Sequence, residues 1–268
     1  MSELDRLVKL MARLRGPDGC PWDREQTHQS LKPYLIEETY EALDAIDSGD
    51  DDGLRDELGD VLLQIVFHAQ LAREEGRFTL EEVAASTSEK LIRRHPHVFG
   101  DASANTPGQV VENWEAIKSR EKREKGQGPS ILAGIPRQLP ALLRARRVQE
   151  RAARSGFDWK HAEEVVDKVR EEVGEFLEAR RDADEEGIEE ELGDVLFSLV
   201  NLARFLRVCP EEALRKTVGK FESRFGYIEQ ELERQGKCPQ GASLEEMDRL
   251  WEASKKIQAE DVTTDRDS

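Results

Sequence analysis

Two groups of carboxylates in this sequence have spacings that suit metal-dependent chemistry. The first group lies in LIEETYEALDAID, residues 35–47, and consists of Glu37, Glu38 and Glu41. On a helix turning about 100° per residue, these three side chains fall within an arc of about 100°, and Glu38 lies among the apolar positions. A buried carboxylate without a partner costs on the order of several kcal/mol. We therefore expect a positive group beside Glu38.

The second group follows at once, in LRDELGDVLLQIV, residues 54–66. Glu57 and Asp60 share a polar stripe with Gln64 and His68 on a helix that is apolar almost all round. Two consecutive helices joined by a short loop pack antiparallel, so the two carboxylate groups can face each other. An all-oxygen acidic cluster suits a hard cation such as Mg²⁺ or Mn²⁺. The pattern predicts at least one divalent ion and leaves the number of ions open.

The same pattern occurs again in the second half of the chain, in VREEVGEFLEARR and IEEELGDVLFSLV. A single E-x-x-E on a helix is usually a solvated face, but an ordered set that recurs at identical spacing is not explained in that way. The sequence is therefore predicted to be a duplication. The five carboxylates Glu37, Glu38, Glu41, Glu57 and Asp60 recur 134 positions later as Glu171, Glu172, Glu175, Glu191 and Asp194.

Both halves are predicted to consist of helices without a sheet, so the expected fold is all-α with two tandem, duplicated helical bundles. We expect domains at 1–125 and 139–268, joined by a linker at 126–138 that is rich in Gly and Pro. The last ten or so residues are expected to be disordered. The predicted helices span 3–15, 28–48, 53–76, 79–94 and 107–125 in the first half, and 138–154, 161–182, 185–207, 210–235 and 243–258 in the second.

Composition limits the classes of partner. Charged residues make up 36% of the chain and aromatic residues 6%, which is typical of solvated helices around aliphatic cores. The 57 acidic and 40 basic residues give a net charge of −17, which argues against binding polymeric nucleic acid through its phosphates. The chain has neither a secretory signal nor an apolar run that could span a membrane, so we expect a cytoplasmic protein. Cys20, Cys209 and Cys238 form no C-x-x-C pair and are interpreted as reduced, incidental thiols.

Each half also offers cations and a tryptophan at helical spacing. Residues four apart share a helix face, so each pair below can act together. Taken singly, such a basic pair is usually part of a solvated surface, and a Trp on a helix usually packs in a core or an interface. The recurrence of both in the same order favours nucleotide binding, with the Trp ring stacking on any base. The pairs are Lys220 with Arg224 and Trp251 with Lys255 in the second half, and Lys90 with Arg94 and Trp114 with Lys118 in the first.

The ordered set E-E-x-x-E followed by E-L-G-D-V-L, with GCPWDREQTH, NWEAIK and GFDW, resembles the MazG family of all-α NTP pyrophosphohydrolases. The resemblance covers the chain except its last ten or so residues. It implies helical bundles that dimerise. It also implies hydrolysis of nucleoside triphosphates, ATP included, to the monophosphate and diphosphate. Mg²⁺ would be the cofactor, with Mn²⁺ as an alternative ion, and both ribo- and deoxyribonucleotides would be accepted.

The resemblance also implies roles for individual residues. Glu171 and Glu37 would orient water or support the ligands. The implied metal ligands are Glu172, Glu175, Glu191 and Asp194 in the second half, and Glu38, Glu41, Glu57 and Asp60 in the first. The implied nucleotide-binding residues are Lys168, Lys220, Arg224, Trp251 and Lys255, with Lys90, Arg94, Trp114 and Lys118 as their first-half counterparts.

Several rival interpretations fit less well. The P-loop motif is absent, and the Gly-to-Glu spacing of a Nudix hydrolase fails. A ferritin-like di-iron bundle needs paired E-x-x-H motifs, and only Glu25 with His28 fits. The group at 95–97 is interpreted as a turn at a helix end, and His28 and His68 as structural. The main alternative to an enzyme is a helical interaction module with a structural or regulatory metal. The sequence leaves open whether one half or both are active.

Overall fold

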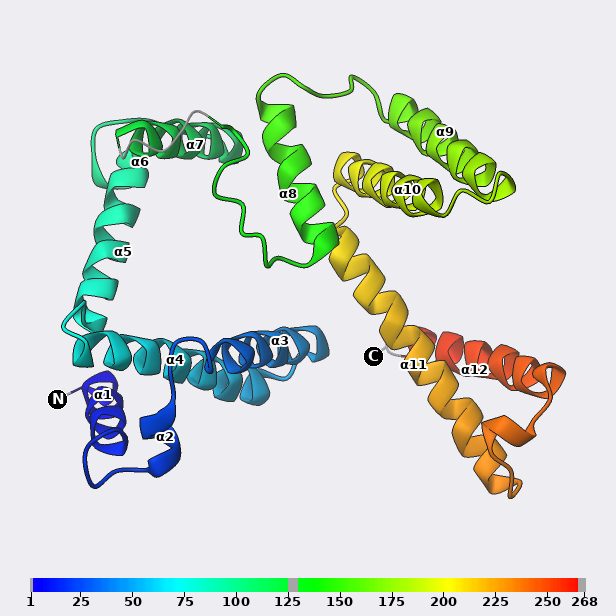
Figure 1. Cartoon of the computed structure of the whole chain (residues 1–268), viewed down its shortest axis with the longest axis horizontal. Coiled ribbons are helices and arrows are strands. Elements are labelled where there is room, and N and C mark those ends of the chain that lie inside the picture. The colour runs from blue at the N-terminus through cyan, green and yellow to red at the C-terminus, as the bar shows by residue number, and fades with distance from the viewer. Residues whose placement is uncertain (1, 125–129, 265–268) are drawn as a thin grey trace. The chain divides into compact units, whose positions relative to one another are not determined.

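The computed structural model describes residues 2–124 and 130–264, and these form helices joined by turns (Figure 1). No strand occurs among them, which confirms the all-α prediction. The chain divides into two compact units, Met1–Gln127 and Gly128–Ser268, which we call unit 1 and unit 2. Each unit contains one copy of both acidic motifs, E-E-x-x-E and E-L-G-D.

Unit 1 follows the predicted order of helices and adds two short ones. The third helix begins four residues later than predicted, because residues 27–30 form a turn in which the Thr27 N–H donates to Ser30 Oγ at 2.9 Å. Unit 1 consists of α1 (Glu3–Leu14), α2 (Pro21–Glu25), α3 (Lys32–Ser48), α4 (Asp51–Glu74), α5 (Leu80–Arg94), α6 (Pro96–Phe99) and α7 (Pro107–Glu124).

Unit 2 repeats this order with longer final helices. It consists of α8 (Ala141–Arg154), α9 (Ala162–Arg181), α10 (Glu185–Phe205), α11 (Pro210–Arg234), the short 3-10 helix η1 (Pro239–Gly241) and α12 (Leu244–Thr264). The part of the C-terminal segment up to Thr264, for which we expected disorder, is helical. Residues 265–268 lie outside the described residues.

A helical hairpin in each unit positions the acidic motifs. In unit 1, α3 ends at Gly49, whose positive φ of 69° reverses the chain, and the Asp50 side chain caps α4 by accepting the Gly53 N–H at 3.0 Å. In unit 2, Ala183 takes the left-handed position with φ 54°, and Asp184 caps α10. The helices of each hairpin pack along each other, α3 with α4 and α9 with α10. E-E-x-x-E therefore faces E-L-G-D in both units.

Polar groups make up a larger share of the buried side chains in unit 2 than in unit 1, where Gln64 and Gln70 are also buried. Unit 1 has a cluster of buried apolar side chains, Met11, Leu31, Val66, Phe67 and Leu71, contributed by α1, the start of α3 and α4. In unit 2, Val165 and Val200 are equally buried, but the buried residue of α8 is polar, as are two others on α9 and α10. These polar residues are Gln149, Glu172 and Ser198.

The segment predicted to be a linker makes contacts with unit 2 where the structure describes it. Residues 125–129 lie outside the described residues. Beyond them, Arg151 Nη1 donates to the carbonyl oxygens of Ile131, at 3.3 Å, and Ala133, at 2.6 Å. These bonds tie residues 131–133 to α8, while the exact domain boundaries stay a prediction.

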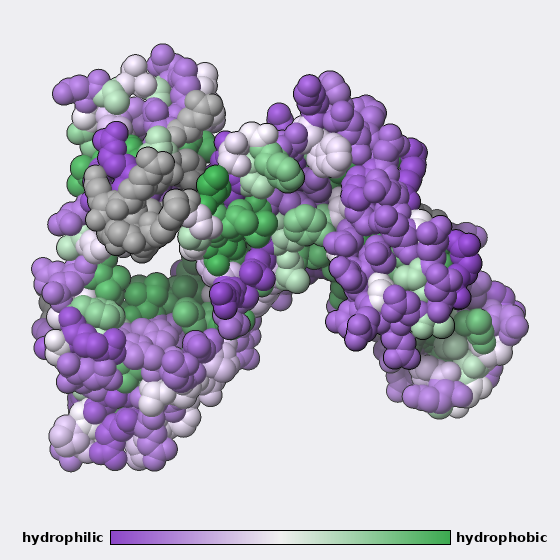
Figure 2. All heavy atoms as spheres, turned by 45° about the horizontal axis from the view of Figure 1, so that its top comes forward, coloured by the Kyte–Doolittle hydropathy of each residue, from purple (hydrophilic) through white to green (hydrophobic). Residues whose placement is uncertain are grey.

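Large apolar side chains are exposed on both hairpins. On α3 and α4, Ile36, Ile46 and Leu58 are each more than half exposed, and on α9 and α10 Leu177 and Leu192 are nearly so. Figure 2 shows apolar residues at the surface among hydrophilic ones. None of the described helices combines the length and the hydropathy that crossing a membrane requires.

Candidate functional site

Three predicted ligands of unit 2 converge between α9 and α10. Glu172 and Glu175 lie one turn apart on α9, and Glu191 lies opposite on α10; each offers a carboxylate oxygen, and these oxygens all lie within 4.8 Å of one another. Glu172 is buried, at 7% exposed. The structure thus brings Glu191 next to Glu175, which lies 16 positions earlier in the sequence, as the prediction of facing helices requires.

The carboxylates of this cluster disfavour one another's charge. Burial raises the pKa of Glu175 above its ordinary value, and Glu172 and Glu191 raise it further. Burial likewise raises the pKa of Glu191, with repulsion from Asp194 and Glu172 added to it. Glu191 Oε2 is buried and has no hydrogen-bond partner in the described part of the chain. An orphaned carboxylate oxygen in an acidic cluster fits a hard divalent cation.

Lys168 joins two of the predicted functional carboxylates. Its Nζ lies 2.8 Å from Glu171 Oε1 and 2.8 Å from Glu172 Oε1, and these two contacts raise the pKa of Lys168. Glu171, the predicted water-orienting residue, is otherwise exposed. Asp194 raises the pKa of Glu191 but lies outside the group whose oxygens are within 4.8 Å.

Unit 1 contains a similar cluster of Glu38, Glu41 and Glu57, whose carboxylate oxygens also lie within 4.8 Å of one another. Burial raises the pKa of Glu38, and repulsion from Asp60 and Glu41 raises it further. Burial also raises the pKa of Glu57, with contributions from Glu41 and Asp60. Glu37 is exposed.

The two clusters differ at one position that the repeat makes equivalent. Lys168 corresponds to Tyr34, 134 positions earlier. The residue of unit 1 that corresponds to Lys168 therefore carries a phenol group in place of the ammonium group that contacts Glu172.

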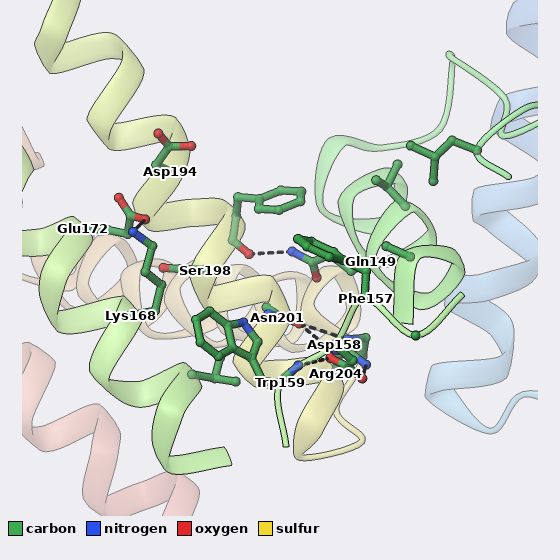
Figure 3. A pocket seen from close by; sticks show the side chains of 16 residues that line it. Gln149, Phe157, Asp158, Trp159, Lys168, Glu172, Asp194, Ser198, Asn201 and Arg204 are labelled. Carbon is green, nitrogen blue, oxygen red and sulfur yellow. Dashed lines mark hydrogen bonds and ion pairs between the residues drawn. The ribbon is translucent and has the colours of Figure 1, made fainter. Parts of the chain in front are cut away.

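A cavity of about 660 Å³ adjoins the cluster of unit 2. In Figure 3 Asp194, Glu172 and Lys168 lie on one side of it and Gln149 and Phe157 on the other. Ser198, Asn201 and Trp159 lie between these two groups.

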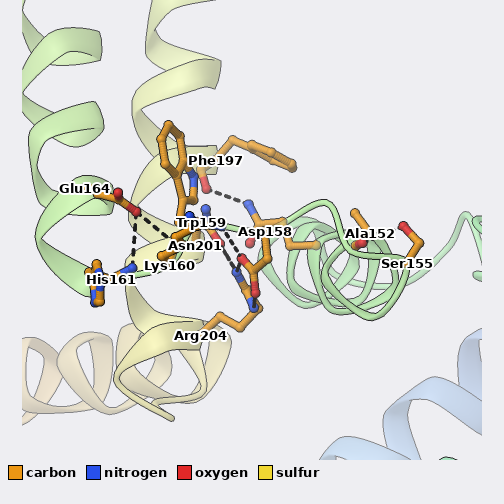
Figure 4. Close-up of polar contacts among 11 residues, drawn as sticks. Ala152, Ser155, Asp158, Trp159, Lys160, His161, Glu164, Phe197, Asn201 and Arg204 are labelled. Carbon is orange, nitrogen blue, oxygen red and sulfur yellow. Dashed lines mark hydrogen bonds and ion pairs between the residues drawn. The ribbon is translucent and has the colours of Figure 1, made fainter.

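A polar network fixes the wall of this cavity (Figure 4). Arg204 Nη1 donates to Asp158 Oδ2 at 3.0 Å, and Arg204 Nε donates to Asn201 Oδ1 at 3.0 Å. The Arg204 guanidinium holds the pKa of Asp158 below its ordinary value. At the start of α9, Glu164 accepts the backbone N–H groups of Lys160, at 2.9 Å, and His161, at 3.2 Å. These bonds anchor the C-terminal end of the segment GFDW, at Asp158, and the residues that follow it.

Sequence reasoning missed Gln149 and Arg204 as cavity residues. GFDW served only as a marker of the repeat. The available signal for Gln149 was a glutamine between apolar residues on an amphipathic helix, and this signal does not distinguish a cavity residue from a core residue.

The predicted nucleotide-binding residues on α11 and α12 lie elsewhere in unit 2, away from the cavity that Lys168 lines. The Arg224 guanidinium lies 5.5 Å from the centre of the Trp251 ring, at the contact of α11 with α12. Lys255 Nζ lies 2.5 Å from Glu252 Oε1, and Lys220 is exposed. None of Lys220, Arg224, Trp251 and Lys255 lines the cavity beside Glu172.

The counterparts in unit 1 pair in a similar way. The Arg94 guanidinium lies 5.3 Å from the centre of the Trp114 ring, and its Nη2 lies 2.6 Å from Glu121 Oε2. Arg94 and Arg93 lower the pKa of Glu121 to about 2. Lys90 and Lys118 are half-buried.

The histidines form no third metal cluster in the described residues. His95 follows the end of α5 and contacts the rings of Trp114, with centroids 5.0 Å apart, and His97, at 5.6 Å. His28 and His68 are stacked, with their Nδ1 atoms 2.8 Å apart.

The MazG nucleotide pyrophosphohydrolase domain matches residues 26–99 and 160–227, which together exceed half of the chain. The chain belongs to the MazG family. Each matched segment holds one complete set of five carboxylates, so the predicted family and the duplicated helical architecture are confirmed. Because the MazG family is a family of hydrolases, the protein is an enzyme of the hydrolase class.

Named relatives span nearly the whole chain. A Thermotoga maritima protein named nucleoside triphosphate pyrophosphohydrolase/pyrophosphatase MazG is 52% identical, over 94% of this chain and 95% of its own. The nucleoside triphosphate pyrophosphohydrolase of Escherichia coli K12 is 50% identical, over 96% and 98%. The uncharacterized Bacillus subtilis protein YabN is 47% identical over 96% of this chain and 52% of its own, so MazG sequence also occurs within longer chains.

Proposed function

We propose that the protein hydrolyses nucleoside 5′-triphosphates between the α and β phosphates, giving the monophosphate and diphosphate. Mg²⁺ is the proposed cofactor, and Mn²⁺ can replace it. The relatives named as nucleoside triphosphate pyrophosphohydrolases support this activity. The proposed substrates include ATP and other ribo- and deoxyribonucleotides.

One observation carries the proposal: Glu172 belongs both to the carboxylate cluster and to the wall of the cavity, and Lys168 and Asp194 line the same cavity. A ligand in this cavity therefore meets carboxylates and an ammonium group at one end. A polyanion alone would be repelled by the carboxylates, whereas a polyphosphate that arrives with a divalent cation is attracted by both.

The residues of unit 2 have distinct proposed roles. Glu172, Glu175, Glu191 and Asp194 would hold the cation, which supplies charge neutralisation at phosphate oxygens and a more acidic bound water. Glu171 would orient the attacking water, as Glu37 would in unit 1.

Lys168 is placed to donate to a phosphate oxygen from its present position beside Glu171 and Glu172. Lys220, Arg224 and Lys255 add positive charge for the leaving diphosphate, and the Trp251 ring offers a face on which the nucleotide can stack. Because these four residues do not line the cavity beside Glu172, the proposal requires α11 and α12 to come to the site from another copy or by rearrangement.

We further propose a homodimer. The hairpins α3–α4 and α9–α10 expose Ile36, Leu58, Leu177 and Leu192, and burial of such apolar area is the main driving force for association. Sedimentation of the purified protein tests this proposal: a monomer at micromolar concentration would contradict it.

Phosphorus NMR on a panel of NTPs with Mg²⁺ tests the activity and reports the bond that is cleaved. Glu175→Gln should abolish turnover by unit 2, and the matched variant Glu41→Gln reports the share of unit 1. An intact protein that binds Mg²⁺ but releases no diphosphate from any NTP would instead support the alternative, a helical interaction module with a structural metal. Asp194→Asn should behave as Glu175→Gln does, because it removes charge rather than packing.

A further inference from the structure

We propose that the cavity of unit 2 is a nucleobase chamber and that Gln149 recognises an N–H group on the edge of the base. This inference rests on the proposed function, because it assigns the nucleoside part of the same substrate. It adds a specificity-determining residue on α8, outside both acidic motifs.

Gln149 has an unused hydrogen-bond acceptor. The side chain is 7% exposed, and its Nε2 donates to the carbonyl oxygen of Phe197 at 2.8 Å. That bond fixes which end of the amide is the oxygen. Gln149 Oε1 is buried without a partner in the described part of the chain. A buried acceptor without a donor is unfavourable, so a ligand donor at this place would remove a deficit of the free protein.

The cavity has the size and walls of a small-molecule site. Its volume of about 660 Å³ lies in the range of roughly 300–1,000 Å³ that such sites occupy. Phe157 is 82% exposed and Trp159 is 44% exposed, so both rings offer faces to a planar ligand. Asn201 is held by Arg204 and therefore presents a fixed polar edge.

The two ends of the cavity suit the two ends of a nucleotide. Figure 3 shows Glu172 and Lys168 on the side opposite Gln149. Phosphates that reach the cation site would therefore leave the base on the side of Gln149.

A single acceptor would suit the proposed breadth over the bases. Adenine and cytosine carry an exocyclic amino group, guanine carries N1–H and an amino group, and uracil and thymine carry N3–H. Each of these bases can donate one hydrogen bond to Gln149 Oε1, whereas unsubstituted purine cannot.

Unit 1 fills the corresponding space with apolar side chains. Phe67 is the residue 134 positions before Asn201, and it is 3% exposed. Met11 is the buried residue of α1, as Gln149 is that of α8. Met11 and Phe67 pack in one cluster with Leu31. A position in the packed core of unit 1 thus corresponds to a position in the wall of the cavity in unit 2.

The test compares ATP with purine riboside triphosphate, which lacks the 6-amino group, in steady-state kinetics of the full chain with Mg²⁺. We expect wild-type kcat/KM to be about tenfold lower for the analogue, because the Gln149 acceptor stays unpaired. Gln149→Met should lower kcat/KM for ATP to the level of the analogue, so that the ratio becomes about one. A general structural defect would lower kcat/KM equally for both substrates and leave the ratio of the two kcat/KM values at about ten.

A matched control exists in unit 1. Gln70 is also buried, its Oε1 also lacks a partner among the described residues, and it lines a groove that no residue of either acidic cluster borders. Gln70→Met should therefore leave the tenfold ratio unchanged. Equal kcat/KM for ATP and the analogue in the wild-type protein, or a tenfold ratio that persists in Gln149→Met, overturns the inference.

A second variant decides the matter if Gln149→Met does not fold. Asn201→Phe copies Phe67 and should fill the chamber, raising KM for ATP at least tenfold while Mn²⁺ binding, measured by electron paramagnetic resonance, stays unchanged. A KM within twofold of wild type overturns the inference. If the wild-type protein cleaves neither triphosphate, the proposed function itself fails; if it cleaves both equally well, only the base chamber fails.

Discussion

Magnesium should raise the unfolding temperature of the protein, and Glu191→Gln should remove the part of this rise that belongs to unit 2. The reason lies in the cluster of Glu172, Glu175 and Glu191, whose oxygens lie within 4.8 Å of one another. Without a cation, the ionised form of Glu191 is disfavoured in the folded protein, as its raised pKa indicates. A divalent ion binds only where the three carboxylates are held together, and therefore stabilises the folded state.

The size of the effect follows from binding linkage. An ion at a hundred times its Kd stabilises the folded state by about 2.7 kcal/mol per site. For a domain of this size, each kcal/mol moves the unfolding temperature by roughly 2–4 °C, so the transition of unit 2 should move by about 5–11 °C. In the metal-free protein, Glu191→Gln should have the opposite effect on the free energy of unfolding and increase it. A carboxyl with a raised pKa loses stability as the pH rises from its ordinary pKa through the raised one, so Glu191→Gln should stabilise the metal-free protein at neutral pH.

Scanning calorimetry with and without Mg²⁺ measures both effects. Glu57→Gln is the matched variant for unit 1, and Asp167→Asn removes an exposed acid of α9 that pairs with Arg170. The Asp167 variant should keep the full magnesium response. An equal rise in wild type and in the double variant Glu57→Gln/Glu191→Gln would refute the reasoning, because the ion would then act outside both clusters.

Three further predictions concern other parts of the two units. Because Arg94 and Arg93 hold the pKa of Glu121 at about 2, the contribution of Glu121 to the stability of unit 1 should be constant above its ordinary pKa of about 4.5 and fall as the pH drops toward 2. Glu121→Gln should flatten this acid limb in circular dichroism titrations, and an unchanged limb would contradict the assignment. Phe67→Ala should cost unit 1 about 3–5 kcal/mol in urea unfolding, because it empties a core position that is 3% exposed; a loss below about 1 kcal/mol would show that the cluster is loosely packed. Lys168→Met should lower kcat/KM for ATP roughly 10- to 100-fold through a lost charge-assisted bond, with Mn²⁺ binding retained; undiminished kcat/KM would remove Lys168 from the substrate site.

The architecture was predictable because two independent patterns agree. Hydrophobic periodicity predicts the long helices, and the repeat of E-E-x-x-E with E-L-G-D requires that whatever one half forms, the other forms too. The convergence of Glu172, Glu175 and Glu191 follows from their faces on two helices joined by a short loop. Short helices such as α2 and α6 were not predicted, since four or five residues carry too little periodicity to be recognised.

The cavity could not be predicted from the sequence. Its walls come from α8, α9, α10 and the segment before α9, and the side chains gather only through tertiary packing. Gln149 and Arg204 have no motif, and each alone resembles an ordinary polar residue on a helix. That Lys220 and Trp251 do not line the cavity also depends on tertiary packing. The spacing of residues within α11 and α12 does not indicate where these helices pack in the unit.

Because the two halves share a fold, each half shows which residues are compatible with the equivalent positions of the other. At the left-handed position after the first helix of the hairpin, unit 1 uses Gly49, with φ 69°, and unit 2 uses Ala183, with φ 54°. A side chain in this conformation is strained by about 1 kcal/mol, whereas glycine is not. Protein engineers could therefore stabilise one hairpin by copying a residue from its own homologous neighbour, beginning with Ala183→Gly, without consulting any other protein.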